Sequence, residues 1–485
     1  MDWQQLLALT PILLAASISV ILLLVIAFVR DHLLTCLITC LGLSGAALSS
    51  LISVGDVAQQ VTPLLIIDDF SRLFGALILL ISLISAWMTY PYLQATDEIR
   101  EEYYILLALA ALGALILIAS NHFASMFIGL ELVSVSLFAM VGYLAHSRDQ
   151  VKLTLEAGVK YMVLSGVSSS FLLFGVALVY AYSGSLSMNI FSQSGSPLLA
   201  PQYLILGTTM IAIGIAFKMS WVPFHMWTPD VYQGAPAPVT GFLAGGVKIA
   251  VFALLIRWLM PIQGPYLPIL HNGLMAMAAL SMIFGNLLAL RQDNLKRLLA
   301  YSSIAHMGYA AITLIAAINV GNLSPLLAAE AAGMYLVTYA AVTMLAFTVL
   351  SHLAAQDLNY ETGQLSHYQG LLWQQPMAGM GLIIAMLALA GIPLTAGFIG
   401  KYYVFIAAVD QQLWPLLWLL IIGSAMGLYY YLRVILILVN NTPEAKPTRN
   451  WGLTPLIILL GLATLWLGIY PGPSIAWVQL ALAGF

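Results

Sequence analysis

Residues 215–225 read Ile215-Ala216-Phe217-Lys218-Met219-Ser220-Trp221-Val222-Pro223-Phe224-His225. A lysine stands here inside an apolar run, and a proline follows it shortly afterwards. Proline lacks a backbone N–H and disrupts a helix, so we expect the helix to be broken close to Lys218. Broken backbone is tolerated at membrane depth only where it is buried in protein or lines a wet cavity. The stretch therefore predicts a helical membrane protein whose interior carries charge.

The composition of the whole chain agrees with a membrane protein. Of its 485 residues, 62% are apolar and 7% are Asp, Glu, Lys or Arg, whereas a soluble protein has roughly 25% charged residues. So few polar residues cannot cover a surface that faces water. A soluble enzyme, a nucleic-acid-binding protein and a disordered protein are excluded, and the formal net charge of -3 offers nucleic acid no basic surface.

Apolar runs of about 20 residues, each long enough for a helix to cross about 30 Å of hydrocarbon, recur through the chain. We count fourteen: 6–28, 32–54, 68–92, 103–120, 122–144, 155–182, 203–222, 238–260, 269–290, 297–318, 327–352, 377–408, 413–438 and 453–470. The runs are continuous rather than alternating, which favours helices over a closed barrel of strands. The first run lacks a basic segment before it and a cleavage site after it, so we expect it to remain as a helix. The predicted fold is an all-α polytopic membrane protein.

Basic residues predict the orientation of these spans. Ten of the 16 Lys and Arg residues fall on one side: Arg30, Arg100, Arg148, Lys152, Arg291, Lys296, Arg297, Arg433, Lys446 and Arg449. Only Arg72 and Arg257 lie near helix ends on the other side. Because cytoplasmic loops are rich in Lys and Arg, the first side is expected to be cytoplasmic. With an even number of spans, both termini then lie on the periplasmic side.

The remaining four lysines lie inside apolar runs, and two carboxylates accompany them: Lys160, Lys218, Lys248, Lys401, Glu131 and Glu156. An ionisable group at bilayer depth costs at least about 2.5–3.5 kcal/mol on insertion scales, so each needs a reason. Each of these charged residues also has an explanation without a transport role. Glu131 can be neutralised by a proton or by one fixed lysine, and a membrane lysine can extend its ammonium group to the interface. Glu156 and Lys160 can form a simple ion pair one helical turn apart. Because the lysines lie on separate helices, we favour a network that exchanges protons.

Two histidines add to this network. His225 follows the expected break, and His306 lies within the run 297–318. A buried histidine is often only a hydrogen-bonded polar residue; the functional alternative is a proton relay. No set of His, Cys and carboxylate residues has metal-ligand spacing on one helix, so we expect no metal site, and Cys36 and Cys40 are expected to be an inert pair. The sequence also contains no phosphate or dinucleotide motif, so we expect no cofactor in this chain.

A second interruption predicts an internal repeat. Residues 390–401 read Ala390-Gly391-Ile392-Pro393-Leu394-Thr395-Ala396-Gly397-Phe398-Ile399-Gly400-Lys401, so the twelfth run, like the seventh, is broken and carries a lysine. The two lie five spans apart, an odd number, so spans 4–8 and 9–13 would be inverted repeats, as in transporters. The predicted organisation is 1–100, three N-terminal helices; 101–260, the first five-helix repeat; 261–440, the second; and 441–485, a last helix and tail.

A carboxylate that approaches or leaves a buried lysine changes how tightly the lysine holds its proton. Our mechanistic hypothesis is that Glu131 and Lys218 form a switching pair, Lys248 is a lateral relay and Lys401 is the outlet. Sodium transport would more naturally use clustered carboxylates or unwound carbonyls. The sequence therefore favours proton transport.

Three segments carry a resemblance to a known family. Lys218 opens the run Lys-Met-Ser-Trp-Val-Pro-Phe-His-Met-Trp-Thr-Pro-Asp-Val-Tyr-Gln-Gly-Ala-Pro-Ala-Pro-Val, which ends at Val239. Residues 294–309 read Asn-Leu-Lys-Arg-Leu-Leu-Ala-Tyr-Ser-Ser-Ile-Ala-His-Met-Gly-Tyr, and residues 391–401 are quoted above. Together they resemble the proton-pumping, antiporter-like membrane subunits of respiratory complex I, the bacterial NADH-quinone oxidoreductase.

The resemblance implies a role and a location. Such subunits translocate protons, driven by electron transfer from NADH to quinone in other subunits of the complex. FMN, iron–sulfur clusters and quinone belong to those subunits, so this chain is expected to hold no redox centre. The implied partners are other membrane subunits of complex I, the lipid bilayer, protons and internal water, and the implied location is the bacterial inner membrane.

The resemblance also implies roles for single residues. The glutamate of the family's helix five matches Glu131, and the charged residues of its helices seven, eight and twelve match Lys218, Lys248 and Lys401. A further lysine on helix six matches Lys160. Some members have glutamate at the position of Lys401, and some have a long lateral helix at the C-terminus. This chain ends about 15 residues after its last apolar run, so we expect no such helix.

Two other functions remain open at this stage. A subunit of a multi-subunit Mrp-type sodium/proton antiporter would share the fold and the buried lysines without an electron-transfer partner. A purely structural membrane scaffold would not need the lysines for transport at all.

Overall fold

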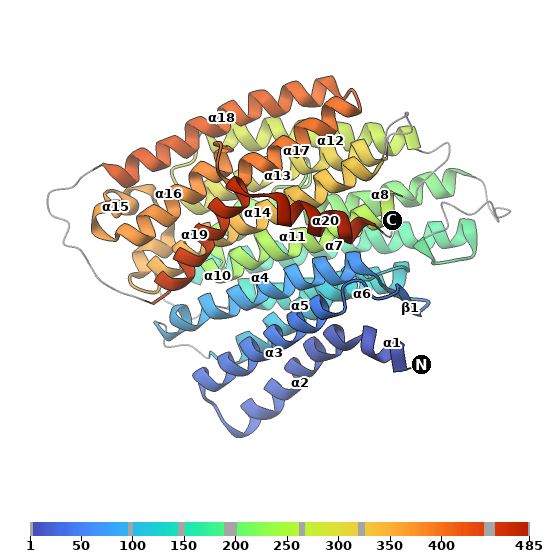
Figure 1. Ribbon diagram of the computed structural model, residues 1–485, viewed down its shortest axis with the longest axis horizontal. Coiled ribbons are helices and arrows are strands. Elements are labelled where there is room, and N and C mark those ends of the chain that lie inside the picture. Colours follow the sequence, from blue (N-terminus) through green and yellow to red (C-terminus); the bar gives the residue numbers. More distant parts are fainter. Residues whose placement is uncertain are drawn as a thin grey trace.

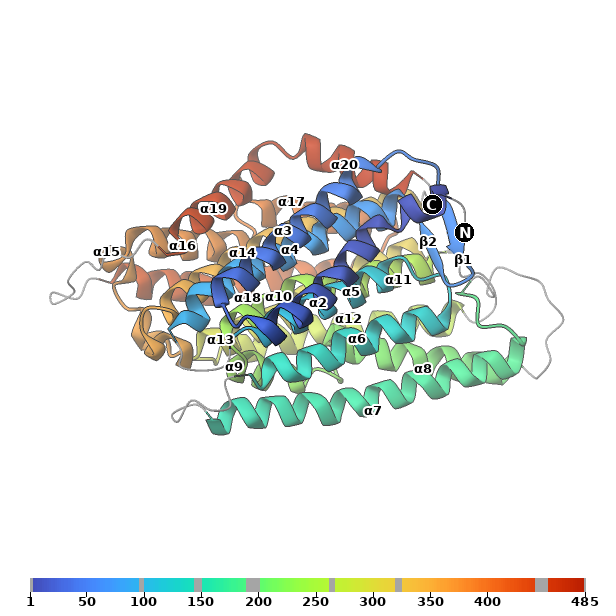
Figure 2. The same cartoon turned by 90° about the horizontal axis from the view of Figure 1, so that it is seen from below.

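The computed structural model describes residues 3–95, 100–143, 151–188, 201–260, 267–318, 325–440 and 452–483. Within these ranges the named elements are helical except for one antiparallel hairpin of β1 (Gln59–Thr62) and β2 (Leu65–Ile67). Most of the long helices run along the length of one elongated bundle, and both chain ends lie at the same end of it (Figures 1 and 2). Arg148, Lys446 and Arg449, which contribute to the predicted orientation, lie outside the described residues.

The N-terminal part consists of α1 (Trp3–Ala8), α2 (Thr10–Phe28), α3 (His32–Ile52) and α4 (Asp69–Gln94). The next part consists of α5 (Glu102–Ile118), α6 (Phe123–Val141), α7 (Val151–Ser183), α8 (Pro201–Met219), α9 (Trp227–Gly234), α10 (Ala237–Phe242), the π-helical turn η2 (Leu243–Val247) and α11 (Lys248–Leu259).

The third part consists of α12 (Leu267–Ala289), α13 (Leu295–Ala317), α14 (Pro325–Ala354), the short 3₁₀ turns η3 (Leu358–Thr362) and η4 (Leu365–Tyr368), α15 (Leu371–Gln374), α16 (Pro376–Ala390), α17 (Ala396–Asp410) and α18 (Trp414–Val439). The chain closes with α19 (Thr454–Ile469) and α20 (Gly472–Leu482), which are bent by 82° relative to each other.

The predicted polytopic all-α fold is confirmed. In the described ranges, 11 helices are long and apolar enough to cross a membrane, or 12 if α19 and α20 count as one broken span. Helices α5 and α16 are apolar but shorter. Each of the fourteen predicted runs coincides with one helix or with consecutive helical elements, three of which (α10, η2 and α11) make up the run 238–260.

Both predicted helix breaks are present. Helix α8 ends at Met219, directly after Lys218, and the chain resumes a helix at Trp227. Helix α16 ends at Ala390, and the next residue, Gly391, has a φ of 85°, a conformation that suits glycine at a helix C-terminus. Helix α17 begins so close to α16 that a Cβ on Gly397 would lie 1.8 Å from the carbonyl oxygen of Ala388. The two half-helices can meet only because Gly397 has no side chain.

A third irregularity was not predicted. Five residues of the eighth span form the π turn η2, and Lys248 is the first residue of the α-helix after it. Gly245 and Gly246 lie in this turn against Met344 and Phe242. A π turn leaves the apolar character of a span unchanged, so the hydrophobic pattern does not reveal it; such turns are frequent at functional sites.

The order of neighbouring helices occurs twice along the chain. Helix α5 packs on α6, α6 on α7, and α7 on α8; in the same way α12 packs on α13, α13 on α14, and α14 on α16 and α17. Each broken span therefore packs against the long helix that precedes it. This arrangement agrees with two five-helix repeats, while the exact domain boundaries stay a prediction.

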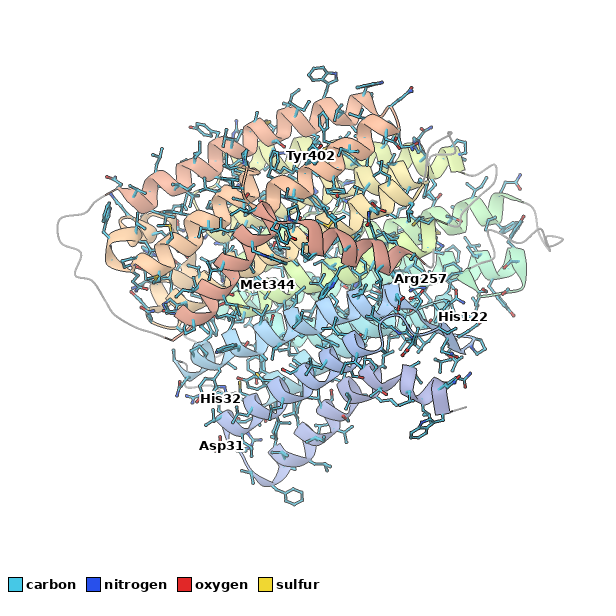
Figure 3. The ribbon with its side chains drawn as sticks, in the orientation of Figure 1. Asp31, His32, His122, Arg257, Met344 and Tyr402 are labelled. Carbon is cyan, nitrogen blue, oxygen red and sulfur yellow. The ribbon has the colours of Figure 1, made fainter. Side chains whose placement is uncertain are left out.

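The two ends of the bundle differ in basic residues. Arg257 and His122 lie at one end, and Asp31 and His32 at the opposite end (Figure 3). We call the end with Asp31 the basic end, because its loops and the adjoining helix turns carry Arg30, Arg100, Arg291, Arg297 and Arg433. Arg30 forms an ion pair with Glu102 there (3.0 Å).

An arginine–carboxylate pair holds the other end together. Arg257 donates to both carboxylate oxygens of Asp68 (2.8 and 2.7 Å) and to the carbonyl of Ile118 (3.0 Å), which joins α11, α4 and α5. The side chains of Arg257 and Asp68 are only 9% and 15% exposed. Burial would raise the pKa of Asp68, but Arg257 and Ser71 hold that pKa below its usual range.

We expect Arg257→Gln to lower the midpoint of thermal unfolding of the detergent-extracted protein. The substitution leaves the Asp68 carboxylate buried without its cation, which costs about 3 kcal/mol. The exposed pair of Arg30 and Glu102 is the control, and Arg30→Gln should change stability by less than about 1 kcal/mol.

The same pair predicts a dependence on pH. A carboxyl group with a lowered folded-state pKa stabilises the fold above its unfolded pKa of about 3.9, and this contribution disappears as the pH falls through the folded value. The stability difference between wild type and Arg257→Gln should therefore shrink in acid. A difference that stayed constant down to pH ~2 would show that the ion pair is not its origin.

Candidate functional site

Serine side chains hydrogen-bond both Glu131 and Lys218. Lys218 is buried at the C-terminal end of α8, and its Nζ donates to Oγ of Ser134 in α6 (2.6 Å) and to Oγ of Ser165 in α7 (2.5 Å). Glu131 lies one turn before Ser134 and accepts a hydrogen bond from Ser169 of α7 (2.5 Å). The ion pairs recorded in the described ranges do not include Glu131 with Lys218. Each charge instead has its own serine partners, which are Ser169 for Glu131 and both Ser134 and Ser165 for Lys218.

Lys248 lies at the centre of a second cluster. Its Nζ donates to Oγ of Ser303 in α13 (2.8 Å), and this hydroxyl also contacts Tyr339 OH of α14 (2.7 Å) and Tyr232 OH of α9 (3.3 Å). A small cavity lies beside them, lined by Tyr232, Ala244, Leu299, Ser302, Ser303, Tyr339, Thr343, Ala346, Phe347 and Leu389. It offers about 10 Å³ to the centre of a water molecule, which is about enough for one water.

His306 continues this cluster toward the twelfth span. Its Nδ1 lies 2.7 Å from Tyr335 OH and its Nε2 lies 3.2 Å from Tyr431 OH, which in turn contacts Ser302. The ring is buried and close enough to Lys248 and Lys401 to interact with both charges. A histidine with a hydroxyl partner on each nitrogen can pass a proton from one side of its ring to the other.

Lys401 is held by the broken helix itself. Its Nζ donates to the carbonyls of Leu389 (3.0 Å) and Ala390 (2.9 Å) at the end of α16. These carbonyls have no partner within their own helix, and the negative end of the helix dipole lies there. A Cβ on Gly391 would lie 2.9 Å from Cδ of Lys401. The break thus creates both the acceptors and the space for the ammonium group.

Lys160 has carboxylate partners instead. Its Nζ lies 2.5 Å from Glu156 one turn earlier and 2.6 Å from Asp230 of α9. Arg297 of α13 binds the other oxygen of Asp230 (2.8 Å). Burial would raise the pKa of Asp230, but its bonds to Lys160 and Arg297 hold that pKa below its usual range. Glu156 and Lys160 therefore form the simple pair that sequence reasoning left open, extended by Asp230 and Arg297.

The remaining predicted residue, His225, is buried in the segment between α8 and α9. Its carbonyl accepts a hydrogen bond from the N–H of Thr228 (3.0 Å). None of the hydrogen bonds recorded among the described residues joins its ring to one of the lysines. A relay role for His225 stays a prediction.

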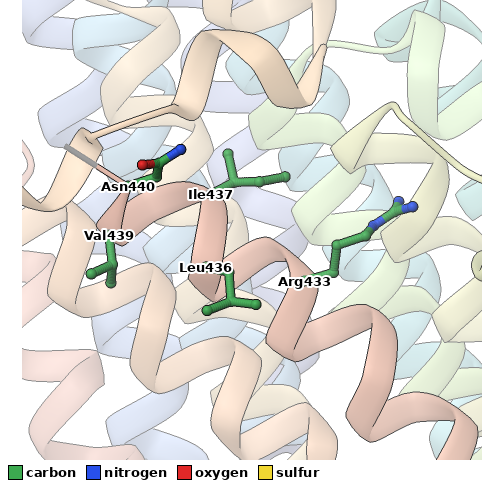
Figure 4. A pocket seen from close by; sticks show the side chains of 5 residues that line it. All are labelled: Arg433, Leu436, Ile437, Val439 and Asn440. Carbon is green, nitrogen blue, oxygen red and sulfur yellow. The ribbon is translucent and has the colours of Figure 1, made fainter. Parts of the chain in front are cut away.

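A hollow of 540 Å³ lies apart from these clusters, at the end of α18 (Figure 4). It is lined by Arg433, Leu436, Ile437 and Val439 of α18 and by Asn440, which follows the helix. None of the predicted site residues belongs to this lining.

Sequence reasoning missed the side chains that hold the lysines. Ser134 follows Glu131 by one turn, and Tyr335 and Tyr339 lie one turn apart on α14, so polar residues repeating on one helical face were an available signal. Asp230 stands inside the stretch that carries the family resemblance. Its partner Arg297 had been counted only as an indicator of orientation.

Known proteins share this architecture. A family model described as NADH:quinone oxidoreductase/Mrp antiporter, transmembrane, matches residues 120–427. A chain of respiratory complex I from Thermus thermophilus, solved with bound aureothin, is 35% identical with a TM-score of 0.80, and the match covers 96% of this chain and 98% of that chain.

Two further solved structures are similar. A chain of the membrane-bound sulfane sulfur reductase, an archaeal respiratory membrane complex, is 26% identical with a TM-score of 0.87, over 99% of this chain and 97% of that one. A chain of the Mrp complex from a Dietzia species is 18% identical with a TM-score of 0.84, over 100% and 98% of the two chains. This last likeness concerns the fold alone.

A double-mutant cycle tests the contact between Ser134 and Lys218. We expect Ser134→Ala and Lys218→Met to be coupled by about 1.5 kcal/mol in unfolding free energy, because a hydrogen bond to a charged group is lost in either single variant. Lys401 shares no recorded contact with Ser134, so the pair Ser134→Ala and Lys401→Met should be additive within about 0.5 kcal/mol. Equal coupling in both cycles would contradict the geometry.

Proposed function

The chain belongs to the transmembrane family of NADH:quinone oxidoreductase and Mrp antiporter subunits, and we propose that it is a membrane subunit of an NADH:quinone oxidoreductase that carries protons across the membrane. In this proposal, electron transfer from NADH to quinone takes place in the other subunits and drives the transport. The basic end of the bundle faces the cytoplasm of a bacterial cell, and both termini face the periplasm.

One observation carries the proposal: Lys218 and Lys248 are buried and Lys401 is partly buried, on three separate spans, and each is held by neutral oxygen atoms. A serine hydroxyl accepts a hydrogen bond from an ammonium group and donates one to an amine, so it serves both protonation states of a lysine. For a lysine that only stabilised the fold, a carboxylate would be the better partner, because it favours the charged form. The arrangement therefore supports lysines that gain and lose protons.

The proposed route follows the clusters along the bundle. Glu131 acts on Lys218 through the serines of α6 and α7, Lys248 receives a proton at the centre, and His306 with its tyrosine partners leads toward Lys401. The cavity beside Ser303 has room for one water, and in this proposal such a water completes the contact between neighbouring groups. Lys401 releases the proton toward the periplasm.

Within the family, Lys401 favours a particular type of subunit. Relatives of the type called M have glutamate at this position, whereas this chain has lysine. We therefore propose that the chain is of the type called N. Genes for the other complex I subunits beside the gene of this chain would support that assignment.

We expect Lys248→Met, introduced into the native complex, to slow NADH-driven proton transport into inverted membrane vesicles about 100-fold, because a positioned proton-transfer group contributes about 10²–10⁴-fold to a rate. Met matches the length of the lysine stem without the amine. Lys152→Met is the control, because Lys152 lies exposed at the start of α7 and should leave transport unchanged.

The outcomes separate the proposal from its rivals. Full transport by the assembled Lys248→Met complex would contradict a relay and favour a structural scaffold. Proton movement driven by a sodium gradient in vesicles without NADH would instead favour the Mrp-type antiporter, which the matching family model also includes.

A further inference from the structure

A fully buried ion pair lies outside the proposed route. Lys296 of α13 and Glu361 of η3 form it, with side chains that are 1% and 3% exposed. Lys296 also donates to the carbonyl of Ala235, just after α9 (2.9 Å). Of the ion pairs recorded among the described residues, this one has the least exposed partners. A buried pair costs desolvation energy and is weak evidence for stability alone, so it invites a functional explanation.

Glu361 lies close to water although it is buried. Its neighbours Asp357, Asn359 and Gln364 are exposed on the loop that follows α14, at the basic end. Lys296 of α13, Tyr92 of α4 and Tyr368 of η4 face the carboxyl group. Burial raises the pKa of Glu361 above its usual range even though Lys296 lies against it. A carboxyl group in this position can take up a proton from the aqueous side.

The pair lies on the same face of α13 as Ser303, the residue that binds Lys248. Lys296 and Ser303 are seven residues apart on the same helix, which places them on one face about 10 Å apart. Tyr232, which donates to Ser303, lies three residues before Ala235, which binds Lys296. Leu299 lies between the two positions on α13 and lines the small cavity beside Lys248. The pair therefore lies about two helical turns from Ser303, and the lining of the cavity extends to Leu299, three residues after Lys296.

We propose that Glu361 loads protons from the cytoplasmic side onto Lys248, with Lys296 as the intermediate carrier. This inference rests on the proposed function. A proton from water first binds the Glu361 carboxylate, which leaves the buried Lys296 ammonium without its counter-charge. Lys296 then gives a proton through the cavity water and Ser303 to the Lys248 amine. Neutral Lys296 takes the proton of Glu361, and the ion pair is restored. One proton has moved from water to Lys248, with no net change in the pair.

Three variants of the native complex test the proposal: Glu361→Gln, Lys296→Met and the double variant. Each single change should reduce NADH-driven proton transport about 100-fold, because one transfer group is lost. The double variant contains no uncompensated buried charge, so we expect it to regain the thermal stability lost in Lys296→Met while its transport stays low. Full transport in the double variant would show that the pair is only structural and would overturn the proposal.

Infrared difference spectroscopy gives a readout other than activity. Titration of the wild-type complex should show a protonated carboxyl band that is missing in Glu361→Gln, and the band should remain in Lys248→Met. An identical band in Glu361→Gln would contradict proton uptake by Glu361. Transport by Lys248→Met distinguishes the loading step from the proposed function. If Lys248→Met blocks transport and Glu361→Gln does not, the loading step is wrong and the proposed function stands. If Lys248→Met transports normally, the proposed function itself fails.

Discussion

The need to give every buried ammonium group an oxygen partner shapes this bundle. Lys218, Lys248 and Lys401 lie among apolar helices, and their partners are hydroxyl and carbonyl oxygens. Lys160 and Lys296, nearer the basic end, have carboxylate partners. A carboxylate favours the charged lysine, whereas a hydroxyl group serves both of its forms. In the proposed function, the type of partner therefore separates two groups of lysines: those that exchange a proton without a carboxylate partner, and those whose charge depends on a carboxylate.

The irregular backbone follows from the same need. An unbroken helix uses all of its carbonyls internally, and only a helix end offers free ones. Helix α16 ends where Lys401 requires acceptors, and Gly391 and Gly397 let the second half-helix approach closely enough to supply the lysine. The π turn before Lys248 and the end of α8 beside Lys218 are further departures from regular helix at a lysine. Three spans therefore lose regular hydrogen bonds where a charge is held.

The sequence predicts the fold well because length and hydropathy control insertion into a membrane. It also predicts the breaks at Pro223 and Pro393, since proline and glycine act locally. The π turn η2 is not predicted because it changes neither the hydropathy nor the length of its span. The residues that hydrogen-bond the lysines and His306 are not predicted either. Ser134, Ser303 and Tyr431 are common residue types, and their role depends on which helices pack together. That Glu131 and Lys218 have different serine partners is likewise a result of packing.

Nitrogen-15 NMR of lysine side chains in the assembled membrane protein tests the central claim most directly, because amine and ammonium nitrogens resonate at different frequencies. The account predicts that the Lys248 signal converts between the two forms as the pH is varied, while the Lys160 signal, held by Glu156 and Asp230, stays that of an ammonium. A Lys248 signal that remains ammonium at every pH where the protein is folded and active would contradict proton exchange at this lysine.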